Sequence, residues 1–231
     1  MPGTGLAAPA STGELYLGRG DDIARGRPLL TGDVLTGIDV NADDHDGTVM
    51  IVAHPCSMRG AHGHLLPRVI VAPVRRYQSI PFASWPDGHF KVMPLPNMLG
   101  DEDQITRAVH LLELGAVRSE QLDRERRILA LKDRGIHILQ QRLVYTLTRV
   151  EVGLEKLNEQ AAHVLLEAEL EEEWADELAD EADAESIARA SEAFCAYMDE
   201  GRRAMLTDAT RRSDTVRVVR AEIRRRAASA D

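Results

Sequence analysis

Short apolar runs separated by turn-forming residues occupy much of the first half of the chain. Gly, Pro, Asp and Asn divide these runs, and Val and Ile are frequent within them. The runs are residues 29–40, which glycines interrupt, 48–54, 68–74 and 89–95, with 108–114 as a closing segment. Short β-branched segments at this spacing favour antiparallel strands in a barrel or sandwich over βαβ units. We therefore expect a β-barrel domain over residues 27–118.

A helical period replaces this pattern after Ser119. Apolar residues recur there at steps of three and four, first over residues 119–132 and then in a second helix that begins at Asp133 or Arg134. One apolar stripe continues through Leu143, Leu147, Val150, Leu154 and Leu157. It indicates a long helix that packs on the barrel or pairs in a coiled coil. A homodimer and an intrachain hairpin would use the same stripe, so both remain open.

The expected fold class is therefore α+β, a small antiparallel β-barrel followed by a long-helix C-terminal region. Residues 1–26, rich in Gly, Pro, Ala, Ser and Thr, indicate a flexible leader. Charge then divides the helical half: residues 151–200 hold 17 acidic and two basic residues, whereas 201–231 hold nine Arg and four acidic residues. We infer a helical region with an acidic arm over residues 119–200 and a basic helical tail over 201–231.

Trp174 lies within the acidic arm. Tryptophan is enriched at binding hot spots, so Trp174 is a candidate anchor for a protein partner, together with Leu147 and Leu154 of the apolar stripe. Packing of Trp174 against the chain's own helices is an equal alternative. The charge pattern itself fits either an interaction arm or an ordinary solvated helix face.

Composition narrows the setting of the protein. The net charge of −10 argues against a chain that coats nucleic acid as a whole and favours a soluble cytoplasmic protein. Two cysteines are too few for a disulfide framework and are typical of a reducing compartment. No apolar run approaches the roughly 20 residues that span a bilayer, and the N-terminus lacks a secretory pattern. We expect no membrane contact.

Reactive side chains are most concentrated between the apolar runs 48–54 and 68–74. Cys56 with the nearby His54 is the residue pair that a cysteine nucleophile and its activating imidazole require. His54, Cys56, His62 and His64 also offer ligand types that zinc accepts, and His54 and Cys56 would share a face on an extended segment. Their spacing matches no familiar zinc finger or ribbon. No cofactor is therefore expected, and zinc is a minor alternative.

Arginines make a third candidate site. Arg59 in the same loop, with Arg68, Arg75 and Arg76 at the ends of the following run, suits recognition of phosphate or carboxylate groups, which makes these residues a candidate site for an anion or for the RNA backbone. Pairing of these arginines with the acidic residues at positions 43, 44 and 46 is the alternative. His110 and His137 lie in apolar periodic stretches, which indicates core or boundary positions.

The order of these pieces resembles a known family. The motifs are Gly32-Asp33-Val34, the run 48–54 after a polar loop, and HPCSMR followed by 68–74. They are similar to the SH3-like barrel of the MazF/PemK growth inhibitors, toxins that cleave RNA and are neutralised by an antitoxin. A group of uncharacterised bacterial and phage-associated proteins with a GDV…HPCSMR arrangement is closer. The resemblance covers at most residues 27–150.

The resemblance implies an SH3-like barrel that binds partners through helices. The usual MazF/PemK catalytic pair is an arginine before the apolar strand and a Thr or Ser after the later strand, but Thr48 and Arg75 stand at those positions here. We therefore expect a binding or regulatory protein of a toxin–antitoxin or phage-related system, which recognises a partner protein or RNA. A metal-independent endoribonuclease that uses groups such as Arg59 and His54, and a zinc- or cysteine-dependent enzyme, are the alternatives.

Overall fold

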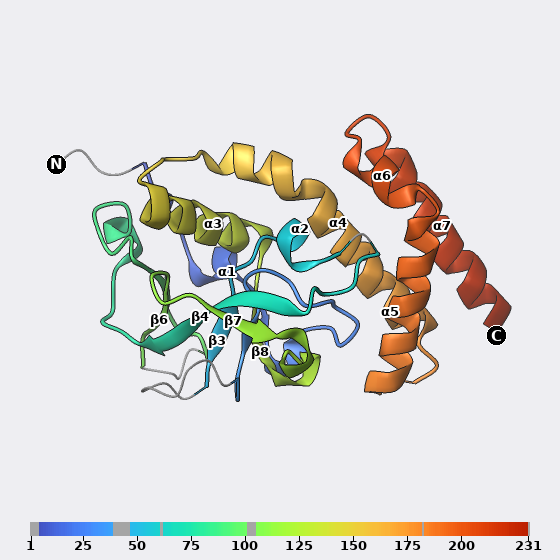
Figure 1. Cartoon of the computed structure of the whole chain (residues 1–231), viewed down its shortest axis with the longest axis horizontal. Coiled ribbons are helices and arrows are strands. Elements are labelled where there is room, and N and C mark those ends of the chain that lie inside the picture. The colour runs from blue at the N-terminus through green and yellow to red at the C-terminus, as the bar shows by residue number, and fades with distance from the viewer. Residues whose placement is uncertain (1–4, 39–46, 61, 101–104, 182, 231) are drawn as a thin grey trace. The chain divides into compact units, whose positions relative to one another are not determined.

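The computed structural model describes residues 5–38, 47–60, 62–100, 105–181 and 183–230. It has the expected mixed α+β fold, with a curled antiparallel sheet and long helices in the C-terminal half (Figure 1). The chain forms two compact units. Unit 1 comprises residues 1–23, 30–58 and 65–160, and unit 2 comprises 24–29, 59–64 and 161–231. Each unit is therefore assembled from segments that are far apart in the sequence.

The sheet belongs to unit 1. Its strands are β1 (Tyr16–Arg19), β2 (Val34–Leu35), β3 (Val49–Ile51), β4 (Arg68–Arg76), β5 (Val92–Leu95), β6 (Arg107–His110), β7 (Gly115–Arg118) and β8 (Arg127–Leu131). They follow the order β1-β8-β2-β3-β4-β6-β5, and β7 pairs with β4 beside β6. The predicted strands in 48–54, 68–74 and 89–95 are confirmed as β3, β4 and β5, and 108–114 overlaps β6.

Two predictions about secondary structure in unit 1 are wrong. Residues 119–132 were expected to be helical, but they contain η3 (Ser119–Gln121), η4 (Arg124–Arg126) and β8. The strand β8 lies between β1 and β2 and buries the consecutive residues Leu129, Ala130 and Leu131. A continuous apolar run of this kind fits a buried strand as well as a buried helix. Part of the expected leader is also ordered, because α1 (Thr12–Leu15) and β1 lie in it and β1 pairs with β8.

The helices of unit 1 are short except for one that packs on the sheet. They are α1, α2 (Pro55–Met58) and α3 (Asp133–Thr148), with η1 (Gly20–Asp22) and η2 (Phe82–Ser84) as single turns. The start of α3 at Asp133 confirms the predicted second helix. This helix packs on β5, β8 and α1 and is buried from Gly135 to Arg142.

The apolar stripe does not form one continuous helix. α3 ends at Thr148, where Arg149 takes a left-handed conformation with φ of 63° and donates its backbone N–H to Tyr145. The next helix, α4 (Leu154–Leu178), begins after the five residues 149–153. Leu147 and Val150 are both 55% exposed. The predicted coiled-coil seam is therefore broken at its centre, because a left-handed residue ends the helical hydrogen-bond pattern.

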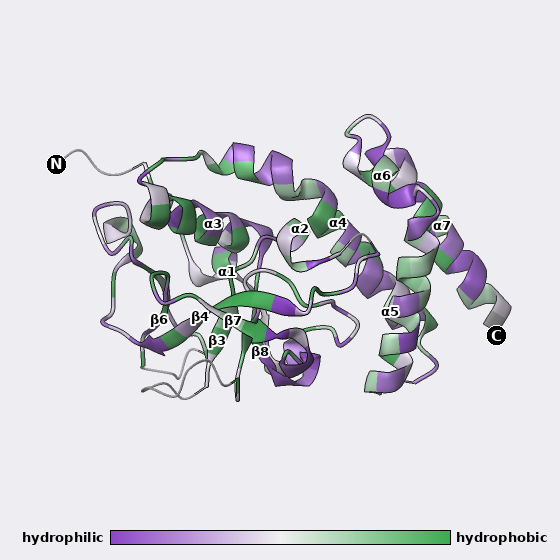
Figure 2. Ribbon diagram, in the orientation of Figure 1, coloured by the Kyte–Doolittle hydropathy of each residue, from purple (hydrophilic) through white to green (hydrophobic). Residues whose placement is uncertain are grey.

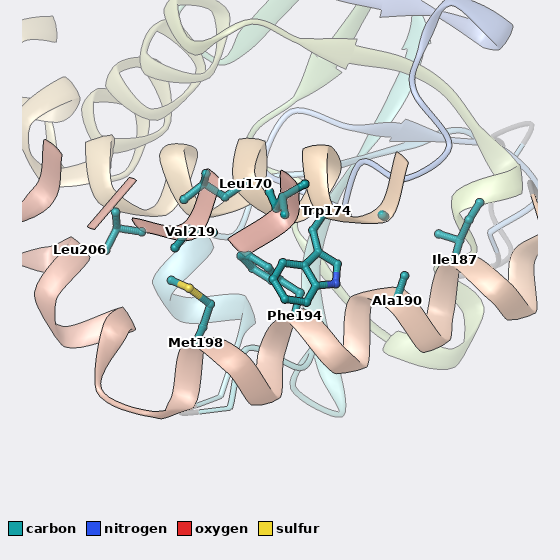
Figure 3. Close-up of a cluster of buried hydrophobic side chains, with 10 residues drawn as sticks. Leu170, Trp174, Ile187, Ala190, Phe194, Met198, Leu206 and Val219 are labelled. Carbon is teal, nitrogen blue, oxygen red and sulfur yellow. The ribbon is translucent and has the colours of Figure 1, made fainter. Parts of the chain in front are cut away.

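Unit 2 is helical. It contains most of α4, together with α5 (Ala184–Asp199), α6 (Arg202–Thr207) and α7 (Arg212–Ala230). Figure 2 shows hydrophilic and hydrophobic residues on the same helices, as expected for helices that bury one face. Their apolar faces meet in a cluster that includes Leu170, Trp174, Phe194 and Met198 (Figure 3). No helix in the described part of the chain is long and apolar enough to cross a membrane.

Candidate functional site

The loop that holds the reactive residues is divided between the two units. His54 and Cys56 belong to unit 1, whereas residues 59–64 belong to unit 2. His54 directly precedes the single helical turn α2, in which Cys56 is exposed. The backbone N–H of Cys56 donates to Nδ1 of His54 at 3.2 Å. The expected extended segment is thus replaced by a helical turn, and this contact engages the amide of Cys56 instead of its thiol.

The zinc candidates are not assembled into a ligand set. His62 is paired with Asp199, with 2.7 Å between Nδ1 and Oδ2. Within the described ranges, no group of three or more His, Cys, Asp or Glu side chains lies close enough to hold a metal ion. His64 is exposed on the far side of Gly63 along the chain. His54, Cys56, His62 and His64 are therefore not brought together as one set of ligands.

Arg59 holds the loop together. Its Nη1 donates to the carbonyl of Gly63 at 2.6 Å, and its Nη2 donates to the carbonyl of Leu29 at 3.0 Å. Both acceptors lie in unit 2, so the guanidinium joins two of its separate segments. Arg59 was a candidate for recognition of phosphate or carboxylate, but Nη1 and Nη2 of its guanidinium each donate to a backbone carbonyl.

Residue 63 must be glycine for this loop to pack. Gly63 has φ of +81°, and a Cβ there would lie 2.8 Å from Nη2 of Arg203 and 3.0 Å from Sγ of Cys195. Arg203 in turn binds Glu167 at 2.8 Å. Burial, followed by the nearby Glu171, raises the pKa of Cys195 to about 11, so its thiol is protonated at neutral pH. This region is a packed polar contact inside unit 2.

The arginines of β4 form two groups. Arg68 begins the strand and Arg75 and Arg76 end it, so they stand about 23 Å apart for seven residues of extended chain. Arg75 pairs with Glu113 at 2.7 Å. Arg76 stands opposite Arg107 of β6, and Arg68 opposite Arg118 of β7. The single cluster predicted with Arg59 is therefore wrong, and the acids proposed as its alternative partners at 43, 44 and 46 lie outside the described residues.

Aromatic, imidazole and charged side chains come together at the end of β4 that carries Arg75. We name this group the Tyr77 cluster: Arg75, Tyr77, His89, His110 and Glu113. The Tyr77 hydroxyl lies 3.1 Å from Nδ1 of His89, and its ring meets the rings of His89 and His110 edge-on, with 6.0 Å between centroids in each case. Glu113 lies 3.4 Å from Nδ1 of His110 and also binds Arg75.

The electrostatics of the Tyr77 cluster keep one imidazole neutral. Burial lowers the pKa of His110, and Arg75 lowers it further, while Glu113 acts in the opposite direction. Its Nε2 is buried with no hydrogen-bond partner in the described part of the structure. A neutral imidazole can accept a proton, half-buried rings can stack on a base, and the guanidinium groups can attract phosphate. The cluster thus combines groups suited to a nucleic acid.

Side chains of helix α3 hold the segment that carries His89 through hydrogen bonds to its backbone. Arg142, which is fully buried, donates to the carbonyls of Trp85 at 2.9 Å and of His89 and Val92 at 3.2 Å. Thr146 donates to the carbonyl of Phe90. His89 itself has φ of 56°, a left-handed conformation that non-glycine residues rarely adopt. These bonds hold the segment before β5 in the shape that places His89 against Tyr77.

Sequence reasoning missed this cluster. His110 was expected to be a core or boundary residue, and neither Tyr77 nor His89 was considered. Its members come from three separate segments, which the antiparallel register of β4, β5 and β6 brings together. The spacing of His110 and Glu113 was the one local signal, and it is too common to identify a site.

The three residues proposed as partner anchors differ in their exposure. Trp174 is 1% exposed and packs on Phe194 and Tyr197, with ring centroids 5.7 and 5.2 Å away. Of the two alternatives for Trp174, packing against the chain's own helices is the one observed. Leu147 is exposed near the end of α3, and Leu154 is half-buried at the start of α4. His137 is buried, as expected.

Comparison with protein-family models and with curated proteins returned no match for this sequence.

Proposed function

We propose that this chain is a binding protein whose half-barrel recognises single-stranded RNA on the face formed by β4, β5 and β6. The observation that carries the proposal is the Tyr77 cluster, in which one tyrosine contacts two histidine rings beside Arg75. Proteins that bind single strands combine aromatic platforms for bases with cationic groups for the backbone. The opposed Arg76 and Arg107 extend the positive charge along the same strands.

The resemblance to MazF/PemK proteins supports RNA over other anions, because those toxins act on RNA. It also supports a place in a toxin–antitoxin or phage-related system, with a protein partner that regulates binding. The overall charge of −10 does not oppose this, since most acidic residues stand in 151–200 and the site is locally basic. Recognition of RNA is thus a property of one face.

Fluorescence anisotropy with a labelled 12-nucleotide single-stranded RNA tests this function. Tyr77→Ala should weaken binding about 5- to 150-fold, since stacking is worth about 1–3 kcal/mol per base. Arg76→Ala should reduce the slope of log K against log salt by about 0.7, the value for one phosphate contact on a single strand. Arg134→Ala, which removes an exposed arginine of α3, is the charge-matched control. No binding by the unmodified protein, or equal losses in the control, would refute the proposal.

A second candidate function is metal-independent cleavage of RNA at the same cluster. The observation that favours it is that His89 and His110 both contact the ring of Tyr77, so two imidazoles lie near one another. In this reaction the 2′-hydroxyl attacks the adjacent phosphorus, one imidazole of the cluster takes its proton, and the P–O5′ bond breaks. The other imidazole supplies the proton that the departing 5′-oxygen needs. The products are a 2′,3′-cyclic phosphate and a 5′-hydroxyl end.

Cleavage is tested with end-labelled RNA in the presence of EDTA. Replacement of His110 or His89 by glutamine should lower the rate at saturating RNA at least 100-fold, a larger factor than the loss of RNA affinity. Arg59→Ala and His54→Ala, which alter the groups suggested by the resemblance, should leave the rate within a few-fold. If the unmodified protein binds RNA but yields no cyclic phosphate, the binding function stands and this second candidate fails.

A further inference from the structure

The half-barrel has a second exposed surface, at the opposite end of β4. We name it the β4–β7 patch: Leu66, Arg68 and Ile70 from one side, and Leu114, Ala116 and Arg118 from the other. Leu66, Ile70 and Leu114 are 39%, 47% and 38% exposed. Side chains alternate between the two faces of a strand, and Val69, Val71 and Val117 between them are buried. Arg68, Ile70, Ala116 and Arg118 therefore form the outer face of this strand pair, and the exposed Leu66 and Leu114 flank it along the chain.

Two arginines meet within the patch. Arg68 stands directly opposite Arg118, and Ile70 directly opposite Ala116. Residues opposite one another in antiparallel strands have Cβ atoms about 5 Å apart, where like charges destabilise the pair. Within the ranges the structure describes, no carboxylate forms an ion pair with either arginine, whereas Arg75 on the same strand binds Glu113. The arrangement is suited to an acidic group from outside.

The apolar content separates this surface from the RNA face. Leu66, Ile70 and Leu114 are aliphatic, and no aromatic ring is available in the patch to stack on a base. In addition, β7 pairs with β4 alone among the described strands. The other side of an edge strand offers backbone groups to an extended chain, which is a common mode of peptide recognition.

We propose that the β4–β7 patch binds an extended acidic segment of a partner protein, which lies along β7. Because side chains of an extended segment repeat every two residues, the segment carries an aliphatic residue for Ile70 and a carboxylate two positions away for Arg68 and Arg118. One carboxylate can accept hydrogen bonds from both guanidinium groups. A second aliphatic residue, four positions from the carboxylate, covers Leu114. For a segment that runs parallel to β7, the recognition pattern is aliphatic-x-aliphatic-x-Asp/Glu.

The test uses a labelled synthetic peptide with the core Val-Thr-Val-Thr-Glu and its counterpart with Lys in place of Glu. The full-length protein should bind the Glu peptide, and Arg68→Glu should weaken that binding at least tenfold. The double change Arg68→Glu and Arg118→Glu should instead favour the Lys peptide. Ile70→Asp should weaken both peptides, while Arg134→Glu on α3 serves as the control for charge. Circular dichroism spectra check that each variant is folded.

Several results would overturn this proposal. They are no binding of the Glu peptide, unchanged affinity in Arg68→Glu, or failure of the charge reversal. If Arg68→Glu lowers affinity for the RNA oligonucleotide as much as for the peptide, the patch is part of a nucleic-acid surface. If Ile70→Asp instead abolishes a dimer seen by sedimentation velocity, a second copy is the occupant. Tyr77→Ala should bind the peptide normally, which separates this result from that for the proposed RNA function.

Discussion

At the scale of single residues, Arg142 carries a charge into the interior of unit 1. Its guanidinium donates to three backbone carbonyls and lies over the ring of Trp85, with 5.0 Å to the centroid. Burial lowers its pKa to about 10, so it remains protonated at neutral pH. The side chain therefore acts as a clamp on the segment that carries His89, and its removal would leave buried carbonyls without donors.

Arg142→Met should lower the free energy of unfolding by about 3 kcal/mol, because hydrogen bonds to a buried charged donor are lost together. Urea unfolding followed by far-ultraviolet circular dichroism measures this change. Arg134→Met on the same helix is the matched control, since Arg134 is exposed and binds Glu14 at the surface. The clamp would be disproved by equal midpoints for the two variants.

Three histidines should make stability depend on pH. Burial lowers the pKa of His110, His137 and His163 below 6.5. When the folded-state pKa of a base lies below its unfolded value, the unfolded chain binds more protons as the pH falls, and stability decreases. The urea midpoint should therefore fall between pH 7.5 and pH 5.5. His137→Gln should reduce that dependence, and a midpoint that rises on acidification would contradict the assignment.

At the scale of elements, the loop 59–64 depends on one glycine. Gly63→Ala should destabilise the protein by about 2–3 kcal/mol, because a left-handed conformation and a close contact with Arg203 and Cys195 both oppose a side chain. Gly201→Ala is the control, since Gly201 has φ of +87° with nothing within 4 Å of an added Cβ. Both variants place alanine in a left-handed conformation, so the difference between their losses of thermal stability gives the contribution of the close contact at residue 63. Equal losses would show that backbone conformation alone decides.

The helices of unit 2 depend on Trp174. It is 1% exposed among the apolar side chains of α4, α5 and α7, and the Arg226 guanidinium lies 4.7 Å from its ring centroid. Trp174→Ala should cost about 3–5 kcal/mol of stability, as expected for truncation of a large buried ring. Calorimetry measures this loss, with Trp174→Phe as the conservative control. A loss of stability much smaller than this would contradict the structural role of Trp174 and favour its role as a partner anchor.

At the scale of the whole molecule, unit 2 takes two short segments from within the sequence of the half-barrel. Removal of residues 161–231 should leave 24–29 and 59–64 without the helices they pack on, so both should become accessible to protease. Limited trypsin digestion followed by mass spectrometry should detect cleavage after Arg25 and Arg59 in the shortened chain. Cleavage at the exposed Arg126 should be similar in both proteins, and protected segments in the shortened chain would contradict this assignment of the units.

By itself, the sequence determined the fold class and the main strands, because runs such as 48–54 and 68–74 are apolar, β-branched and bounded by turn residues. It also determined the start of α3 at Asp133, where the helical period is clear. Only the tertiary structure decided that residues 127–131 form a strand, since a fully buried strand carries no distinct period. Strand register likewise brought Tyr77, His89 and His110 together. Residues so far apart in the sequence form no local motif that would predict this contact. The loop that seemed most reactive serves packing for the same reason: its partners, Leu29 and Asp199, lie far away along the chain.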